Sequence, residues 1–129
     1  MNLKDLHHQV VELIKQGQFT KGIEDFYAED VIQQSNGDAP IQGRQKLADG
    51  EREYEAKVTS LDKVDILASV IHDQGGGNGV VMYECQMQWK HQVAGAVNVE
   101  QAVVERWKEG KIQSIRFYGT FESENEMTS

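Results

Sequence analysis

The stretch over residues 26–47, FYAEDVIQQSNGDAPIQGRQKL, constrains the fold more than any other part of the sequence. Its first residues read as the end of a helix, and residues 31–35 read as a short strand. A polar loop with the only proline of the chain follows, and a new helix opens at Gly43 and Arg44. A segment that passes from helix to strand and back to helix predicts a fold that combines both kinds of element.

Two helices are predicted before this segment and one after its loop. In the first, Asn2 is placed to cap the start and Gly17 to end it, and the apolar residues lie at helical spacing: Leu3, Leu6, Val10, Leu13 and Ile14. A second, shorter helix follows Thr20. A third runs from about residue 44 to residue 57, because its apolar and aromatic positions recur at three- and four-residue steps.

The rest of the chain reads as strands over residues 60–72, 80–91, 97–107 and 112–121. Residues 80–91 alternate most cleanly, since polar residues such as Glu84 and Gln86 occupy every second position. The alternation predicts that the other face points toward the core; it carries Tyr83, Cys85, Met87 and Trp89. The glycine-rich run at residues 73–79 lies between two strands and reads as a hairpin loop.

The last turn, Lys108-Glu109-Gly110, sets the register of the final hairpin. A two-residue Glu-Gly turn of type I′ would need a positive φ at Glu109, which is unfavourable, so a three-residue loop is expected. That loop pairs Val103 with Ile115 and Gln101 with Phe117. It places these four side chains inward together with Val99, and it places the following residues on the opposite face: Ala102, Val104, Ile112, Arg116 and Tyr118.

This order of elements resembles the nuclear transport factor 2-like superfamily, and in particular its SnoaL-like (polyketide cyclase-like) branch, over nearly the whole chain. The resemblance implies an α+β, cone-shaped fold, in which a strongly curved, mostly antiparallel sheet wraps around three N-terminal helices. It also implies a pocket between the sheet and the helices and a homodimer formed by the convex face. We expect one domain over residues 1–122 and an acidic, frayed tail over residues 123–129.

Strand alternation and the resemblance together give the residues that we expect to line the pocket and to bind its ligand: Gln33, Ser35, Tyr54, Tyr83, Cys85, Met87, Trp89, Gln101, Val103, Ile115 and Phe117. Phe26 and Leu47 are expected in the same cavity or core. The polar members can bond one another or bound water, or they can orient a small ligand. Both interpretations stay open at this point. The thiol of Cys85 is expected to be buried and unreactive.

The same resemblance argues against one chemistry of the superfamily. The steroid isomerases use a tyrosine and two carboxyl groups, and the positions that correspond here are Val10, Ser35 and Val103, so we expect no steroid isomerase activity. The last predicted strand contains no carboxylate that could serve a cyclase. Glu105 shares the inward parity but lies near the end of the hairpin, so we expect it to pair with Lys111 or Arg44. We expect the third helix to expose its glutamates, Glu51, Glu53 and Glu55.

Composition limits the remaining classes. The sequence has 21 Asp and Glu against 13 Lys and Arg, a net charge of -8, which argues against binding to nucleic acid or to an anionic membrane. No apolar run reaches the roughly 20 residues of a membrane span. The single cysteine and the absence of a signal-like start predict a cytoplasmic protein. No metal and no cofactor are expected, and His91 is the one histidine whose position points toward a pocket mouth.

The leading hypothesis is a SnoaL-like pocket protein that binds a small apolar or weakly polar molecule, with its exact role unknown. Two alternatives stay open. One is an enzyme of the cyclase, isomerase or hydratase type that uses acid–base groups not yet placed, which a carboxylate or histidine with a shifted pKa in the pocket would favour. The other is an interaction module whose cavity is filled by its own side chains.

Overall fold

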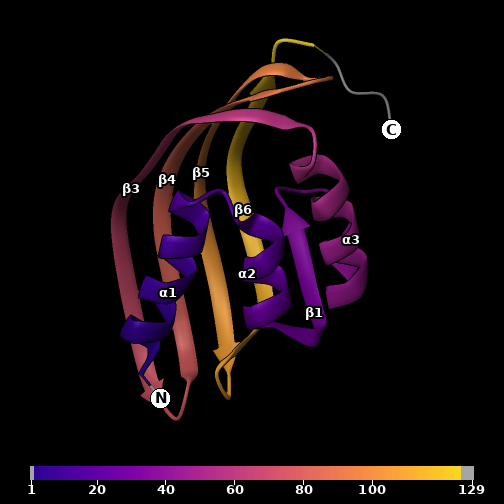
Figure 1. Ribbon diagram of the computed structural model, residues 1–129. Coiled ribbons are helices and arrows are strands. Elements are labelled where there is room, and N and C mark those ends of the chain that lie inside the picture. Colours follow the sequence, from indigo (N-terminus) through magenta and orange to yellow (C-terminus); the bar gives the residue numbers. More distant parts are fainter. Residues whose placement is uncertain (1, 126–129) are drawn as a thin grey trace.

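A computed structural model describes residues 2–125 and has three helices packed on the concave side of one curved sheet (Figure 1). The helices are α1 (Leu3–Lys15), α2 (Phe19–Phe26) and α3 (Arg44–Glu55). The strands are β1 (Tyr27–Ser35), β2 (Ile41–Gln42), β3 (Val58–Gly75), β4 (Asn78–His91), β5 (Gly95–Lys108) and β6 (Lys111–Ser123). The predicted α+β, cone-shaped fold is confirmed.

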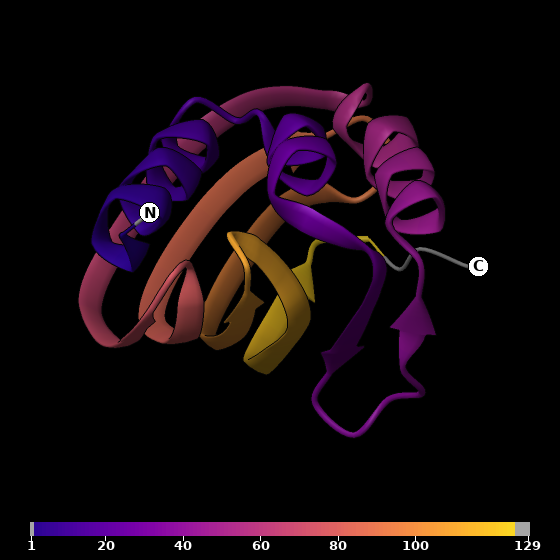
Figure 2. The same cartoon turned by 90° about the horizontal axis from the view of Figure 1, so that it is seen from below.

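The sheet has the order β2-β1-β6-β5-β4-β3. Only β1 and β6 pair in parallel, so the sheet is mostly antiparallel, as predicted. The pairing of β4 with β5 is regular along its length, whereas β3 departs from regular register against β4 at four places. Such irregularities bend a strand and increase its twist. Figure 2 shows the result, a sheet that curls around α1 and α2 while α3 lies beside β1.

The first turn of α1 is capped by a neighbouring residue, whereas the first turn of α2 is capped by a residue that is distant in the sequence. The side chain of Asn2 caps α1 by accepting a hydrogen bond from the backbone N–H of Lys4 at 2.8 Å, as predicted. Gln18, which precedes α2, makes no side-chain cap. Instead the Glu55 carboxylate of α3 accepts bonds from the backbone N–H groups of Phe19 and Thr20 and from the Thr20 hydroxyl. These bonds connect the C-terminal end of α3 to the N-terminal end of α2.

The turn between β5 and β6 differs from the predicted one. It contains two residues, Glu109 and Gly110, with φ values of 51° and 80°. The strained φ of Glu109 is accompanied by a bond from its backbone N–H to the Asn78 side chain, and Gly110 donates to the Gly77 carbonyl, so contacts with the neighbouring hairpin hold the turn. The prediction of a three-residue loop was wrong because it considered only local backbone preference.

The inward face of this hairpin is nevertheless the predicted one. A register shift near Trp107, with Gln113 as the extra residue, follows the shorter turn, so that Val103 pairs with Phe117 rather than with Ile115. The turn is one residue shorter than predicted, and the register shift adds one further residue. Together they move the pairing by two residues, so Ile115 and Phe117 still point inward. Ile112 is buried and lines the cavity, so its predicted place on the convex face was wrong.

Several element ends also differ from expectation. The strand β1 starts at Tyr27, β2 was not predicted, and α3 ends at Glu55. The expected tail starts later than residue 123, since β6 includes Ser123 and the backbone N–H groups of Glu124 and Asn125 bond to carbonyls at the start of β5 and in the turn before it. Residues 126–129 of that tail lie outside the described residues.

The hydrophobic core fills the concave side of the sheet. Tyr83, Met87, Trp89 and Ile115 belong to one buried cluster with Phe26 and Leu47, and Phe117 packs against it, which confirms the predicted grouping of these seven side chains. Within the part of the chain that the structure describes, no helix combines the length and the apolar character that crossing a membrane requires.

Candidate functional site

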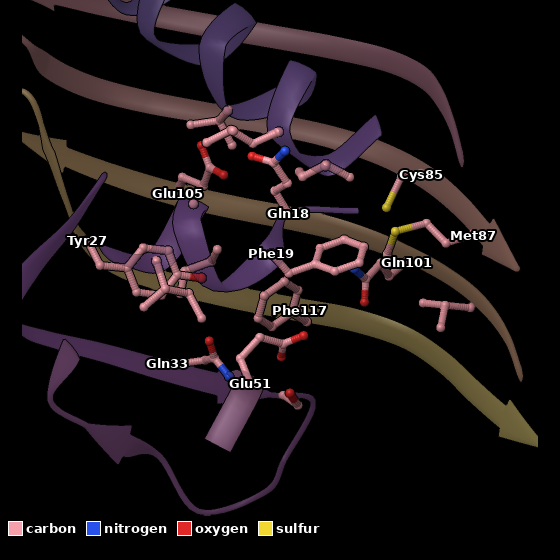
Figure 3. Close-up of a pocket in the computed structure, with 18 of the residues that line it drawn as sticks. Gln18, Phe19, Tyr27, Gln33, Glu51, Cys85, Met87, Gln101, Glu105 and Phe117 are labelled. Carbon is pink, nitrogen blue, oxygen red and sulfur yellow. The ribbon is translucent and has the colours of Figure 1, made fainter. Parts of the chain in front are cut away.

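A cavity of about 260 Å³ lies between the concave face of the sheet and the helices (Figure 3). Ten of the eleven residues expected at a pocket lie on its wall: Gln33, Ser35, Tyr54, Tyr83, Cys85, Met87, Trp89, Gln101, Ile115 and Phe117. Val103 does not. It pairs with Tyr83 and Phe117, whose longer side chains reach the cavity, while its own short side chain is buried in the core. A role for any of them in ligand binding stays a prediction.

Aromatic side chains form one end of the cavity. The Trp89 indole N–H donates a hydrogen bond to the Tyr54 hydroxyl at 2.8 Å, and the Trp89 ring also packs against Phe19 and Phe121. His91 does not line this cavity. Its ring stacks on Tyr54 at 4.2 Å between centroids, and its Nδ1 accepts hydrogen bonds from the backbone N–H groups of Val93 and Ala94. His91 therefore packs against a residue of the cavity wall without lining the cavity itself.

Glu105 lies in the cavity wall with only 1% of its surface exposed. Its carboxylate accepts hydrogen bonds from the Trp107 indole N–H at 3.1 Å and the Tyr83 hydroxyl at 3.3 Å. Burial raises its pKa to about 7, and these two hydrogen bonds offset part of the rise. The expected ion pair with Lys111 or Arg44 is wrong, because Lys111 bonds to the Asp25 carbonyl and Arg44 to the Tyr27 carbonyl.

Glu51 brings a second carboxyl group to the cavity from α3. Burial raises its pKa to about 7, and the nearby charge of Glu55 adds to the rise. The expectation of a solvated glutamate face on α3 therefore holds only for Glu53, which is exposed. The residues at positions 51, 54 and 55 all turn toward the body of the protein, since they lie within about one helical turn of one another.

Two further polar residues of the wall were missed by the sequence analysis. Gln18 lies in the link between α1 and α2, and Tyr27 is the first residue of β1. Tyr27 is 8% exposed. Burial raises the pKa of Tyr27, and the charges of Glu105 and Glu51 add to the effect. The sequence placed Tyr27 at the end of a helix, where no inward direction could be assigned.

The remaining polar groups of the wall are amides, a hydroxyl and a thiol, from Gln33, Ser35, Gln101 and Cys85. Burial raises the pKa of the Cys85 thiol, and a hydrogen bond with Gln101 offsets part of the rise. The thiol is buried, as expected, and its pKa is raised overall, away from that of a reactive thiolate. Residues 2–125 bring together no three acidic, histidine or cysteine side chains that could hold a metal ion.

Known structures with this arrangement confirm the fold. A candidate SnoaL-like polyketide cyclase from Mesorhizobium loti has a TM-score of 0.66 and 16% identity, over 92% of this chain and 99% of its own. A candidate isomerase from Bacillus subtilis has a TM-score of 0.67 and 14% identity, over 92% and 84%. An NTF2-like protein of unknown function from Cytophaga hutchinsonii has a TM-score of 0.63 and 12% identity, over 90% and 97%.

These similarities define the class of fold, which is nuclear transport factor 2-like, shared with proteins described as SnoaL-like. No family model and no curated protein matches the sequence. At such low identity the fold is what the chain has in common with these proteins. The chemistry of the cavity has to be argued from its own residues.

Proposed function

We propose that this protein is a SnoaL-like pocket protein, which binds a small, mainly apolar organic molecule in the cavity between the sheet and the helices. The observation that carries the proposal is the cavity itself. Its aromatic end, with Trp89 and Phe19, suits a flat apolar group, and a few fixed polar groups, such as those of Gln33 and Gln101, suit the orientation of one polar substituent.

A neutral aromatic alcohol, 2-naphthylmethanol, tests this proposal by isothermal titration calorimetry. Gly22 of α2 lies on the cavity wall, and a Cβ atom there would meet nothing within 4 Å, so Gly22→Phe adds a side chain that occupies the cavity. Gly50 of α3 is exposed with equal free space and lies outside this cavity, so Gly50→Phe is the matched control.

The wild-type protein and Gly50→Phe are expected to bind the alcohol, and Gly22→Phe is expected to bind it at least about tenfold more weakly. The absence of binding to the wild-type protein, or equal binding by both variants, would contradict the proposal. Mass spectrometry of the purified protein complements the titration, because a compound that copurifies with the wild type and not with Gly22→Phe would identify the natural ligand.

A second candidate function is proton-transfer catalysis in the same cavity. It is favoured by one observation: Glu51 and Glu105 both line the cavity with pKa values of about 7, where a carboxyl group is an effective acid or base near neutral pH. The test uses 5-nitrobenzisoxazole, which opens when a base removes one ring proton. Acceleration that Glu51→Gln or Glu105→Gln abolishes and Glu53→Gln preserves would support catalysis, and a rate equal to that of buffer would count against it.

We propose further that the protein acts as a cytoplasmic homodimer through its convex face. A cytoplasmic place agrees with the free, buried thiol of Cys85. On the convex face, Val70, Met82 and Val104 form a row across β3, β4 and β5, and the first two are 64% and 45% exposed. Leaving such a row in water is unfavourable, which supports its burial against a partner.

The charges beside this row suit a second copy of the same chain. Glu84 lies on β4 on one side of β5, and Arg116 lies on β6 on its other side. A two-fold axis that passes near Ala102 and Val104 would bring Glu84 of each protomer toward Arg116 of its partner. Light scattering tests the dimer: the wild type is expected at twice 14.6 kDa and Val104→Asp at 14.6 kDa. A wild-type monomer would contradict the dimer, and a dimeric Val104→Asp would place the interface elsewhere.

A further inference from the structure

The wall of the cavity contains acidic side chains and no basic side chain among the described residues. It contains two carboxyl groups, those of Glu51 and Glu105, and none of the described residues on its wall is Lys, Arg or His. The described cations near these elements have other partners: Arg52 bonds to Asp49 and Glu24, and Lys111 bonds to a backbone carbonyl. Glu105 is buried and Glu51 is half-buried. A carboxylate removed from water without a cation is unfavourable, so each group is expected to keep its proton or to be neutralised by a ligand.

The two carboxyl groups come from different walls and share one neighbour. Glu51 projects from α3 and Glu105 from β5, and Tyr27 lies near both, since the charges of both raise its pKa. In Figure 3, Tyr27 lies between Glu105 on one side and Glu51 and Gln33 on the other. The hydroxyl of Tyr27 and the two carboxyl groups therefore offer hydrogen-bond acceptors to one region of the cavity.

A ligand group for this region has to carry several N–H donors and, in the ionised state of the site, a positive charge. A protonated amine meets both requirements, while an anionic group would face two carboxylates and no cation. The aromatic rings of the cavity wall, Phe19, Tyr54 and Trp89, suit the apolar body of such a molecule. The net charge of -8 also attracts cations to the protein.

We propose that the ligand of this cavity is an amine with an apolar, aromatic-sized body, whose cationic nitrogen binds in the region of the cavity that Glu51, Glu105 and the Tyr27 hydroxyl line. The inference rests on the proposed ligand-binding function and names the class of ligand. It replaces the apolar or weakly polar molecule expected from the sequence with a cationic one, because the cavity wall contains Glu51, which was expected to be solvated, and Glu105, which was expected to be ion-paired.

The pH dependence of binding gives this inference a distinct signature. The titratable groups that face Glu51 are Glu55 and Tyr54 of its own helix and Tyr27 of β1, and those that face Glu105 are Tyr83 of β4 and Tyr27. None of them supplies a positive charge. Both carboxyl groups have a pKa of about 7, so they ionise between about pH 6 and pH 8, and a bound ammonium group favours the ionised forms. The affinity for an amine is therefore expected to rise with pH in this range.

Three probes that share one aromatic body test the proposal by calorimetry at pH 6, 7 and 8: 2-naphthylmethylamine, 2-naphthylmethanol and 2-naphthoate. We expect the amine to bind at least about tenfold more tightly than the alcohol at pH 8, and the carboxylate to bind most weakly. Glu51→Gln is expected to remove most of the preference for the amine while leaving alcohol binding nearly unchanged. Glu53→Gln, an exposed change on the same helix, is the matched control and is expected to keep the preference.

The outcomes separate this inference from the function on which it rests. Equal binding of the amine and the alcohol would overturn the amine proposal and leave the pocket function standing, whereas binding of none of the three probes would contradict the pocket function. An amine affinity that falls as pH rises would also overturn the inference, since it would mean that the carboxyl groups act as neutral hydrogen-bond donors. Glu105→Gln, checked for folding by circular dichroism, provides a second variant that is expected to reduce the same preference.

Discussion

The concave and convex faces of the sheet are built from alternate residues of the same strands, yet they differ in what surrounds them. On β5, Val103 on the concave side is 1% exposed, while its neighbour Val104 on the convex side is only partly buried. The concave face is covered by α1, α2 and α3 (Figure 1), and among the described residues no element covers the convex face. Burial against helices, and not residue type, therefore separates a core position from an available surface.

Glutamate residues on the two faces also differ in their exposure to water. Glu84 and Glu100 lie on the convex face, where water surrounds them, and they are exposed. Glu105 lies on the concave face, where burial raises its pKa to about 7. Alternate positions of one sheet thus turn the same side chain into a surface charge or into an acid that is poised near neutral pH.

The largest contrast is expected between two aspartate substitutions at neighbouring residues. Val103→Asp buries a carboxylate with no partner and should cost more than about 4 kcal/mol, which prevents stable folding. Val104→Asp, compared with the wild type at concentrations where both are monomers, should cost less than about 1 kcal/mol, because water can reach the new side chain. Urea denaturation followed by tryptophan fluorescence measures both. Similar losses of unfolding free energy in the two variants would contradict the proposed difference in burial between the two faces.

A smaller but still large effect is expected for Trp89→Ala, which should destabilise the protein by roughly 3–5 kcal/mol. The ring is 7% exposed and packs against Tyr54, Phe19 and Phe121. Glu84→Ala on the opposite face of the same strand is the control, with an expected change within about 0.5 kcal/mol. A loss below about 1 kcal/mol for Trp89→Ala, in the same denaturation assay, would count against burial of this ring.

The third prediction concerns the pH dependence of stability. The pKa of Glu105 is raised from its ordinary value of about 4.5 to about 7 in the folded state, so the folded protein holds this proton more tightly than the unfolded chain does. The stability contributed by the proton is fully present below about pH 4.5 and is lost as pH rises through 7. For this buried group the loss amounts to about 3 kcal/mol.

Glu105→Gln should remove this dependence, because the amide does not titrate. The difference in unfolding free energy between the wild type and Glu105→Gln is therefore expected to shift in favour of the variant between pH 5 and pH 8.5, in urea denaturation at several pH values. Glu84→Gln, an exposed change on the convex face, is the matched control. A constant difference between wild type and Glu105→Gln would show that this carboxyl group is already ionised at pH 5.

The sequence predicted the cavity wall where alternation is regular, and it failed where geometry depends on distant contacts. Tyr83 to Trp89 were assigned correctly, because β4 pairs with β5 without interruption. The turn at Glu109 was assigned wrongly, because its positive φ is held by Asn78 and Gly77, which local preferences do not reveal. Glu105 was assigned the correct parity and the wrong partner, since parity follows from the strand and partners depend on elements that approach from elsewhere.

The sequence by itself determined the order of the three helices and the five longer strands and the inward set of β4, because these follow from hydrophobic period and turn residues. The mostly antiparallel sheet was implied by the family resemblance. Only the tertiary structure decided which polar groups share the cavity. Glu51 of α3, Tyr27 of β1 and Glu105 of β5 are far apart in the chain and meet because the sheet curves and the helices pack into its concave side. Their raised pKa values have the same origin, since desolvation depends on what covers a group in space and not on its neighbours in the sequence.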